Sequence, residues 1–126
     1  MLERIVETLS GVRPTFTGAE ETLHALVADA LSRAGIPFVH EARLSPRERV
    51  DFLAGSVAVE IKRGKPDARA LAAQIARYAS CGEVEAVCVV SEQRVSLPAR
   101  VCGKPVRLVL LGRGWDLEAL ARATGM

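Results

Sequence analysis

The stretch that most restricts the fold is a pair of apolar segments, 49–54 and 57–62, separated by two residues, Gly55 and Ser56. Both segments alternate in the manner of a β-strand. A connection this short joins only adjacent antiparallel strands. The sequence therefore predicts a β-hairpin here, and the rest of the fold has to be built around it.

Apolar periodicity assigns the other elements. In chain order they are a helix at 2–12, a helix at 19–35, a strand at 36–44, a helix at 67–80, a strand at 84–91, a strand at 105–112 and a last helix from about Trp115 to Thr124. Thr17 and Asp67 are the expected N-caps of the second and third helices. A meander followed by a helical crossover predicts an α/β fold: one three-layer domain, 1–126, with a mixed β-sheet flanked by helices.

Composition limits the class of protein further. A chain of 126 residues that is 49% hydrophobic is long enough to bury one core, and its net charge of +2 is too small to predict a nucleic-acid partner. Three cysteines without CxxC spacing argue against a zinc site or a disulfide framework. No secretion signal is recognisable, and no segment approaches the roughly 20 apolar residues that cross a bilayer. We expect a soluble cytoplasmic protein with no membrane partner.

The hairpin carries charged residues where apolar ones would be expected. Glu60 and Lys62, at i and i+2, point to the same face of one strand, and Asp51 stands in the other strand. We expect the two acids to lie close together on one sheet face, where they repel unless a cation such as Mg²⁺ lies between them. A lysine there would stabilise charge on a phosphate. The pattern indicates metal-assisted phosphodiester hydrolysis; a solvated Glu–Lys ion pair is the simpler alternative.

This arrangement resembles the core signature of the PD-(D/E)XK nuclease superfamily. Asp51, eight further residues, Glu60, one residue and Lys62 follow one another in the superfamily's strand–turn–strand context. Val50 stands where the signature has proline, and many members share that departure. The resemblance covers about 17–111 and implies a restriction-endonuclease-like fold.

Two helices extend the resemblance. Gln74 and Tyr78, within Q-I-A-R-Y, are similar to the QxxxY element of RecB-type members. Glu20 matches the acid that many members carry on their first core helix, although Glu21 is an alternative. Thr17 and Glu20 also form a T-x-x-E capping box, which needs no catalytic role.

The resemblance implies a role for each matching residue. Asp51 and Glu60 would bind the metal directly, together with the backbone carbonyl of Ile61, and Lys62 would hold or activate the attacking water. The implied cofactor is Mg²⁺ or Mn²⁺. Glu20 would bind metal through water.

Other residues near the expected site have less definite roles. Gln74 and Tyr78 would orient Lys62 or contact the DNA backbone; packing of the tyrosine and exposure of the glutamine are the alternatives. His24 follows Glu20 by one helical turn and could lie at the margin of the site, but a structural or exposed histidine is expected. Glu41 is another candidate acid of the site, but it is expected to be a solvated residue of an edge strand. Basic residues around the strand turns would contact DNA phosphates; they are Arg43, Arg47, Arg49, Arg63 and Lys65.

The function expected from these residues is a metal-dependent, structure-selective DNA endonuclease. A RecB-like nuclease and a Holliday junction resolvase, as expected in phage or prokaryotic DNA repair and recombination, both fit. A resolvase would be a homodimer, with the N-terminal helix and segment 105–112 as its interface, and a protein partner would be another source of specificity. The alternatives are a non-catalytic DNA-binding or complex-assembly module that keeps the fold, or an interaction protein with a coincidental motif.

Overall fold

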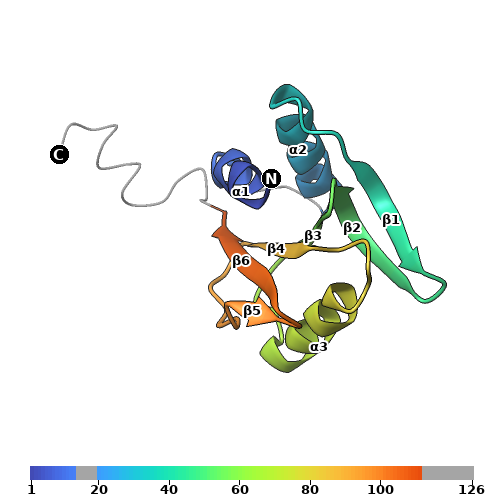
Figure 1. Ribbon diagram of the computed structural model, residues 1–126. Helices are drawn as coiled ribbons and strands as arrows, with labels where there is room; N and C mark the ends of the chain where they lie inside the picture. The colour runs from blue at the N-terminus through green and yellow to red at the C-terminus, as the bar shows by residue number, and fades with distance from the viewer. Residues whose placement is uncertain (14–19, 112–126) are drawn as a thin grey trace.

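The computed structural model describes residues 1–13 and 20–111, which form three helices and six strands (Figure 1). The elements are α1 (Leu2–Ser10), α2 (Glu20–Arg33), β1 (Val39–Ser45), β2 (Glu48–Ala54), β3 (Val57–Lys62), α3 (Ala68–Ala79), β4 (Ala86–Ser91), β5 (Arg100–Val101) and β6 (Lys104–Leu110). The expected N-cap Thr17 and the expected helix from Trp115 lie outside the described residues. Within them, every expected helix and strand is present, with ends that differ by a few residues.

The six strands form one mixed sheet in the order β1-β2-β3-β4-β6-β5. The meander β1-β2-β3 is antiparallel, whereas β3, β4 and β6 run parallel. The helix α3 makes the crossover from β3 to β4, as the sequence predicts. The short strand β5 was not expected; it pairs antiparallel with the start of β6 over two residues, too few for a periodic signal.

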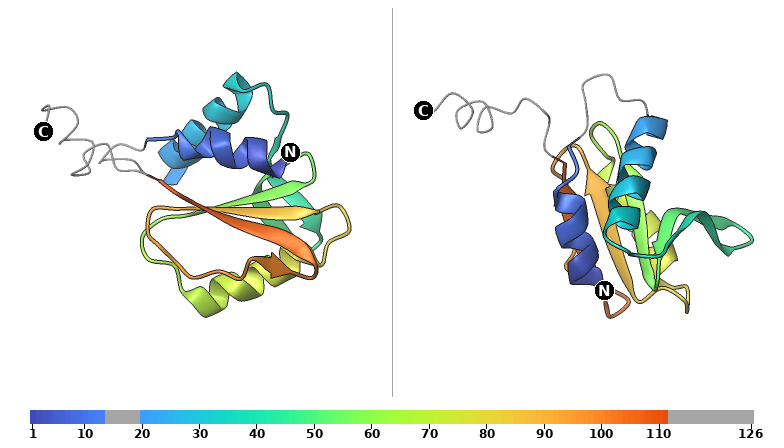
Figure 2. Two further views of the ribbon diagram at one scale, coloured as in Figure 1. Left: turned by 60° about the vertical axis from the view of Figure 1, so that its left-hand side comes forward. Right: turned by 90° about the horizontal axis from the view of Figure 1, so that it is seen from above.

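Helices cover both faces of the sheet, so the domain has three layers (Figure 2). On one face α1 and α2 bury Ile5, Leu9, Val27 and Leu31 against the sheet. On the other face α3 buries Leu71, Ile75 and Tyr78. Every residue of β4 is buried, as expected for a strand covered on both sides.

Local chemistry accounts for the position of α3. Its N-cap is Asp67, whose Oδ1 accepts hydrogen bonds from the backbone N–H groups of Arg69 and Ala70. The apolar residues then recur at helical spacing, which aims one side of the helix at the sheet. The helix is therefore held at its start by its cap and along its length by burial.

The surfaces expected to form a homodimer interface are largely used within the domain. The apolar face of α1 packs into the core, and Val106 and Val109 of β6 are buried. Leu110 is the large apolar side chain of β6 that is exposed, at 37%. Among residues 1–13 and 20–111, no helix is long and apolar enough to cross a membrane.

The hairpin turn between β2 and β3 supplies a test of the fold. Gly55 has φ +60°, a conformation that costs other residues about 1–2 kcal/mol, while an added Cβ would meet only Met1 Cγ, at 3.9 Å. We expect Gly55→Ala to lower Tm by roughly 4–8 °C. Gly82→Ala is the matched control, because Gly82 has no positive φ and nothing within 4 Å of its added Cβ. Equal melting temperatures for the two variants would contradict this account of the turn.

Candidate active site

The candidate site lies where β2 and β3 separate. The two strands pair from Ala54↔Val57 to Phe52↔Val59, and the next residues along are Asp51 and Glu60. Here a side-chain hydrogen bond takes the place of the backbone pairing between the strands: Asp51 Oδ2 accepts the backbone N–H of Ile61 at 2.8 Å. The backbone N–H of Asp51 lies 3.4 Å from Glu60 Oε1. Each acid is therefore tied to the backbone of the opposite strand.

The regular alternation of β2 breaks at Asp51. Val50 is buried in the core under α3, whereas Phe52 is buried in the core under α1 and α2. The neighbouring strand β1 changes faces at the same level, since Phe38 packs on the α1/α2 side and Ala42 on the α3 side. Asp51 and Glu60 are nevertheless the next opposed residues of the hairpin and lie close together, and side-chain-to-backbone hydrogen bonds connect the two strands there in place of the regular ladder.

Glu60 is the buried centre of the site, with 6% of the residue exposed. Its Oε1 accepts the Tyr78 hydroxyl at 2.9 Å. Its Oε2 accepts Gln74 Nε2 at 3.1 Å and lies 3.3 Å from Lys62 Nζ. The predicted cluster of Glu60, Lys62, Gln74 and Tyr78 is thus brought together.

The observed contacts of Gln74 and Tyr78 are with Glu60. Gln74 Nε2 also donates to the Tyr78 hydroxyl at 2.8 Å, and that hydroxyl lies 3.2 Å from the carbonyl of Arg49. Tyr78 is fully buried, so its hydroxyl is a polar group within the core and not at the rim. The two residues hold the carboxylate in place; their expected action on Lys62 or on DNA stays a prediction.

Burial sets the electrostatics of the two acids. Loss of solvent raises the pKa of Glu60, and the nearby charge of Asp51 raises it further, against the lowering effect of Lys62. Burial likewise raises the pKa of Asp51, while its hydrogen bond from Ile61 lowers that pKa. Burial and the charge of Glu60 raise the pKa of Tyr78, so its hydroxyl stays protonated and donates. Two partly desolvated carboxylates therefore lie near one lysine, whose Nζ is 3.3 Å from Glu60 Oε2.

The donor set fits a hard divalent cation. Carboxylate oxygens are the ligands that Mg²⁺ and Mn²⁺ prefer, and the excess negative charge at Asp51 and Glu60 is what a cation would neutralise. The backbone group of Ile61 seen in contact with Asp51 is its N–H; a ligand role for its carbonyl stays a prediction.

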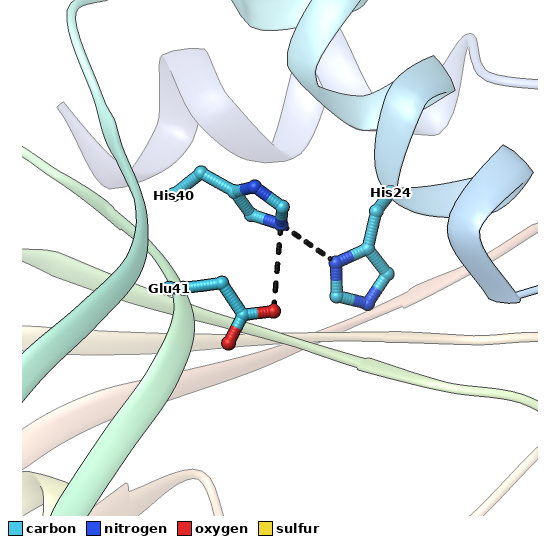
Figure 3. A group of neighbouring side chains, drawn as sticks. All are labelled: His24, His40 and Glu41. Atoms are coloured by element: carbon cyan, nitrogen blue, oxygen red, sulfur yellow. Dashed lines mark hydrogen bonds and ion pairs between the residues drawn. The ribbon is translucent and has the colours of Figure 1, made fainter.

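Two histidines adjoin the site (Figure 3). The sequence offered the margin of the site as one position for His24, although a structural or exposed role was expected, and it gave no indication for His40. His24 Nε2 on α2 lies 3.8 Å from Asp51 Oδ2, and its Nδ1 lies 2.9 Å from His40 Nε2 on β1. Glu41 is half-exposed on the edge strand, as expected, but its Oε1 lies 3.7 Å from His40 Nε2. A signal existed for His24 alone, which follows Glu20 by one helical turn.

The expected DNA-contacting residues lie on two segments. Arg43, Arg47 and Arg49 are exposed on the hairpin β1–β2, which projects from the body of the domain (Figure 1). Arg63 and Lys65 are exposed in the turn after β3, and Arg63 pairs with Glu92 at 2.8 Å. Glu20 begins α2, but its side chain and that of Glu21 lie outside what the structure describes, so the choice between them stays open.

A pocket opens beside Lys62, the last residue of β3. It has a volume of about 380 Å³ and is lined by Lys62, Gln74 and Arg77 together with the first turn of α3. Lys62 and Gln74 therefore face both Glu60 and a space that a bound group can enter. A group bound in this pocket would have access to the lysine.

The raised pKa values predict how the metal-free protein responds to pH. A carboxyl whose pKa is raised on folding favours the native state while protonated, and that contribution is lost as pH rises from the usual 3.8 through the raised value. We expect Asp51→Asn to raise Tm by roughly 2–5 °C at pH 8 without divalent cations, and the gain to shrink toward pH 4.

The matched control for this measurement is Asp29→Asn, because Asp29 is an exposed residue of α2 that pairs with Arg33 at 2.9 Å. We expect it to change Tm little at any pH. A Tm for Asp51→Asn below that of the unmodified protein across the pH range would contradict the assignment of Asp51 as a destabilising buried charge.

Comparison of the chain with family models, with curated proteins and with solved structures finds no match.

Proposed function

We propose that the protein is a divalent-cation-dependent DNA nuclease of the PD-(D/E)XK type. The observation that carries the proposal is the joint position of Asp51, Glu60 and Lys62 at the opening between β2 and β3, beside an accessible pocket. Two acids raised in pKa by burial and one lysine are the groups that phosphodiester hydrolysis needs around a cation.

The residues have separable tasks in this proposal. Asp51 and Glu60 hold Mg²⁺ or Mn²⁺, which when bound polarises the scissile phosphate and neutralises its charge. Lys62 holds the attacking water and stabilises charge that develops on the phosphate. Gln74 and Tyr78 keep Glu60 in place by donating to its two oxygens.

The surface around the site favours a backbone-reading mode of DNA binding. Exposed arginines on the hairpin β1–β2 and basic residues in the turn after β3 belong to the segments that flank Asp51 and Lys62 in the chain, and they would contact phosphates. Such contacts carry no base sequence, which fits selection of a DNA structure. A RecB-like nuclease and a Holliday junction resolvase remain the two forms of this proposal.

A cleavage assay tests the activity directly. The DNA panel contains a single strand, a duplex, a flap and a four-way junction, each with Mg²⁺ or Mn²⁺. We expect cleavage of at least one substrate, and a loss of roughly 100-fold or more in Lys62→Ala. Symmetric paired nicks in the junction would identify the resolvase form.

The control for Lys62→Ala is Lys104→Ala, because Lys104 lies on β6 and donates to the carbonyl of Cys81, with β4 between it and β3. We expect this control to keep its activity. Cleavage that survives Lys62→Ala unchanged would show that the activity comes from another site or from a contaminant.

A specific observation supports a second function, a non-catalytic DNA-binding module. Protein groups alone already satisfy the charge of Glu60, because four donors lie near its two oxygens. They are Lys62 Nζ, Gln74 Nε2, the Tyr78 hydroxyl and, at 3.4 Å, the backbone N–H of Asp51. A direct metal ligand would have to release one of them, and we expect Lys62, whose side chain is 29% exposed, to be the donor that moves.

Metal binding separates the two functions. For the nuclease we expect Mg²⁺ or Mn²⁺ to raise Tm, and Glu60→Gln to remove most of that rise. Glu83→Gln, a change at an exposed residue in the turn after α3, should leave the rise intact. A metal response equal in Glu60→Gln and in the unmodified protein would favour the non-catalytic module.

A further inference from the structure

We propose that His24, His40 and Glu41 form a second cation site, separate from the carboxylate site and suited to a transition-metal ion such as Zn²⁺. The three side chains come from α2 and β1 and turn toward one another (Figure 3). One ligand atom of each lies within 4.8 Å of the others. The site therefore has two nitrogen ligands and one carboxylate.

The distances suit a single ion. Two nitrogens each about 2.0–2.1 Å from one ion are about 2.9 Å apart at a right angle and about 3.3 Å apart at the tetrahedral angle. His24 Nδ1 and His40 Nε2 are 2.9 Å apart. Glu41 Oε1, at 3.7 Å from His40 Nε2, belongs to a half-exposed side chain that can turn inward. An ion thus needs only small side-chain movements.

The ligand chemistry separates this site from the carboxylate pair. Imidazole nitrogen suits Zn²⁺, Co²⁺ or Ni²⁺, whereas Mg²⁺ prefers carboxylate, carbonyl and water oxygens. Two histidines and one glutamate with a further open position are a known ligand set for Zn²⁺. The two sites therefore differ in the ion that each would select.

The second nitrogen of His24 supports this assignment. With Nδ1 on the ion, Nε2 keeps its proton and faces Asp51 Oδ2, 3.8 Å away. Metal-bound histidines usually donate their other N–H to a carboxylate, which fixes the ring. At 3.8 Å this contact is longer than a hydrogen bond, so the ring would have to move toward Asp51 to donate to its carboxylate.

The backbone and the ring packing hold the other two ligands in position. Glu41 has φ +55°, an uncommon conformation for a residue other than glycine, at the point where the ladder between β1 and β2 omits one pair. The ring of His40 stacks on Phe52, with centroids 4.6 Å apart and planes inclined by 24°. In this conformation the Glu41 carboxylate lies 3.7 Å from His40 Nε2 and 4.0 Å from Arg49 Nη1, so a bound ion would share this carboxylate with the arginine.

Titration of the 126-residue chain with Co²⁺ in the absence of DNA tests the proposal, with visible absorption and Tm as the readouts. We expect His40→Phe and Glu41→Gln each to weaken Co²⁺ binding at this site at least 10-fold. The phenyl ring keeps the stack on Phe52 but lacks a ligand nitrogen, and the amide keeps the shape of Glu41. Glu60→Gln should keep one Co²⁺ with histidine-ligand absorption.

Two results would overturn the proposal. The first is Co²⁺ affinity unchanged in both His40→Phe and Glu41→Gln. The second is loss of all Co²⁺ binding in Glu60→Gln while His40→Phe still binds, which would place the ion between His24 Nε2 and the two acids. If His40→Phe fails to fold, His40→Gln replaces it. Because DNA is absent, neither result depends on whether the protein cleaves DNA.

Discussion

A buried carboxylate on a central strand is the constraint to which much of this structure responds. Glu60 lies on β3 with strands on both sides, and an unpartnered charge there would cost several kcal/mol. Its partners come from three elements: Lys62 from β3 itself, Gln74 and Tyr78 from α3, and a backbone N–H from β2. The position and face of α3 are thus fixed by polar contacts as well as by apolar burial.

The opening between β2 and β3 follows from the same constraint. A regular ladder would continue to Asp51 and Glu60, but Asp51 instead uses a side-chain oxygen to accept the N–H of Ile61. The hairpin beyond this point twists from one core to the other, as the burial of Val50 and Phe52 on opposite faces shows. The acidic site therefore lies at the point of β2 where burial changes from one core to the other.

Local sequence patterns predicted most of the fold and the centre of the site. The turn at Gly55, the cap at Asp67 and the apolar run of β4 depend on neighbouring residues, so the sequence contains their whole cause. Glu60 and Lys62 were placed correctly within a strand for the same reason. The two-residue strand β5 was missed, because it forms only against β6.

Features that depend on distant residues could not be predicted in this way. His24 and His40 come together only because α2 lies against the edge of the sheet. They are sixteen residues apart in the sequence, and that separation does not indicate a contact. The change of face at Asp51 depends on how the hairpin twists over two cores. The two donors from α3, Gln74 and Tyr78, lie 14 and 18 residues from Glu60 in the sequence. Only the packed helix shows that they reach this carboxylate and not another.

The anchoring of Glu60 by α3 has a consequence for how such a site can change. The carboxylate, the lysine and both anchoring side chains occupy one continuous segment, from β3 through the crossover helix. That segment is also what joins the antiparallel and parallel halves of the sheet. Insertions at the tip of the hairpin β1–β2 or in the connection to β6 leave this segment intact, so those peripheral parts can vary in length while Glu60 and its side-chain partners are inherited as a single unit.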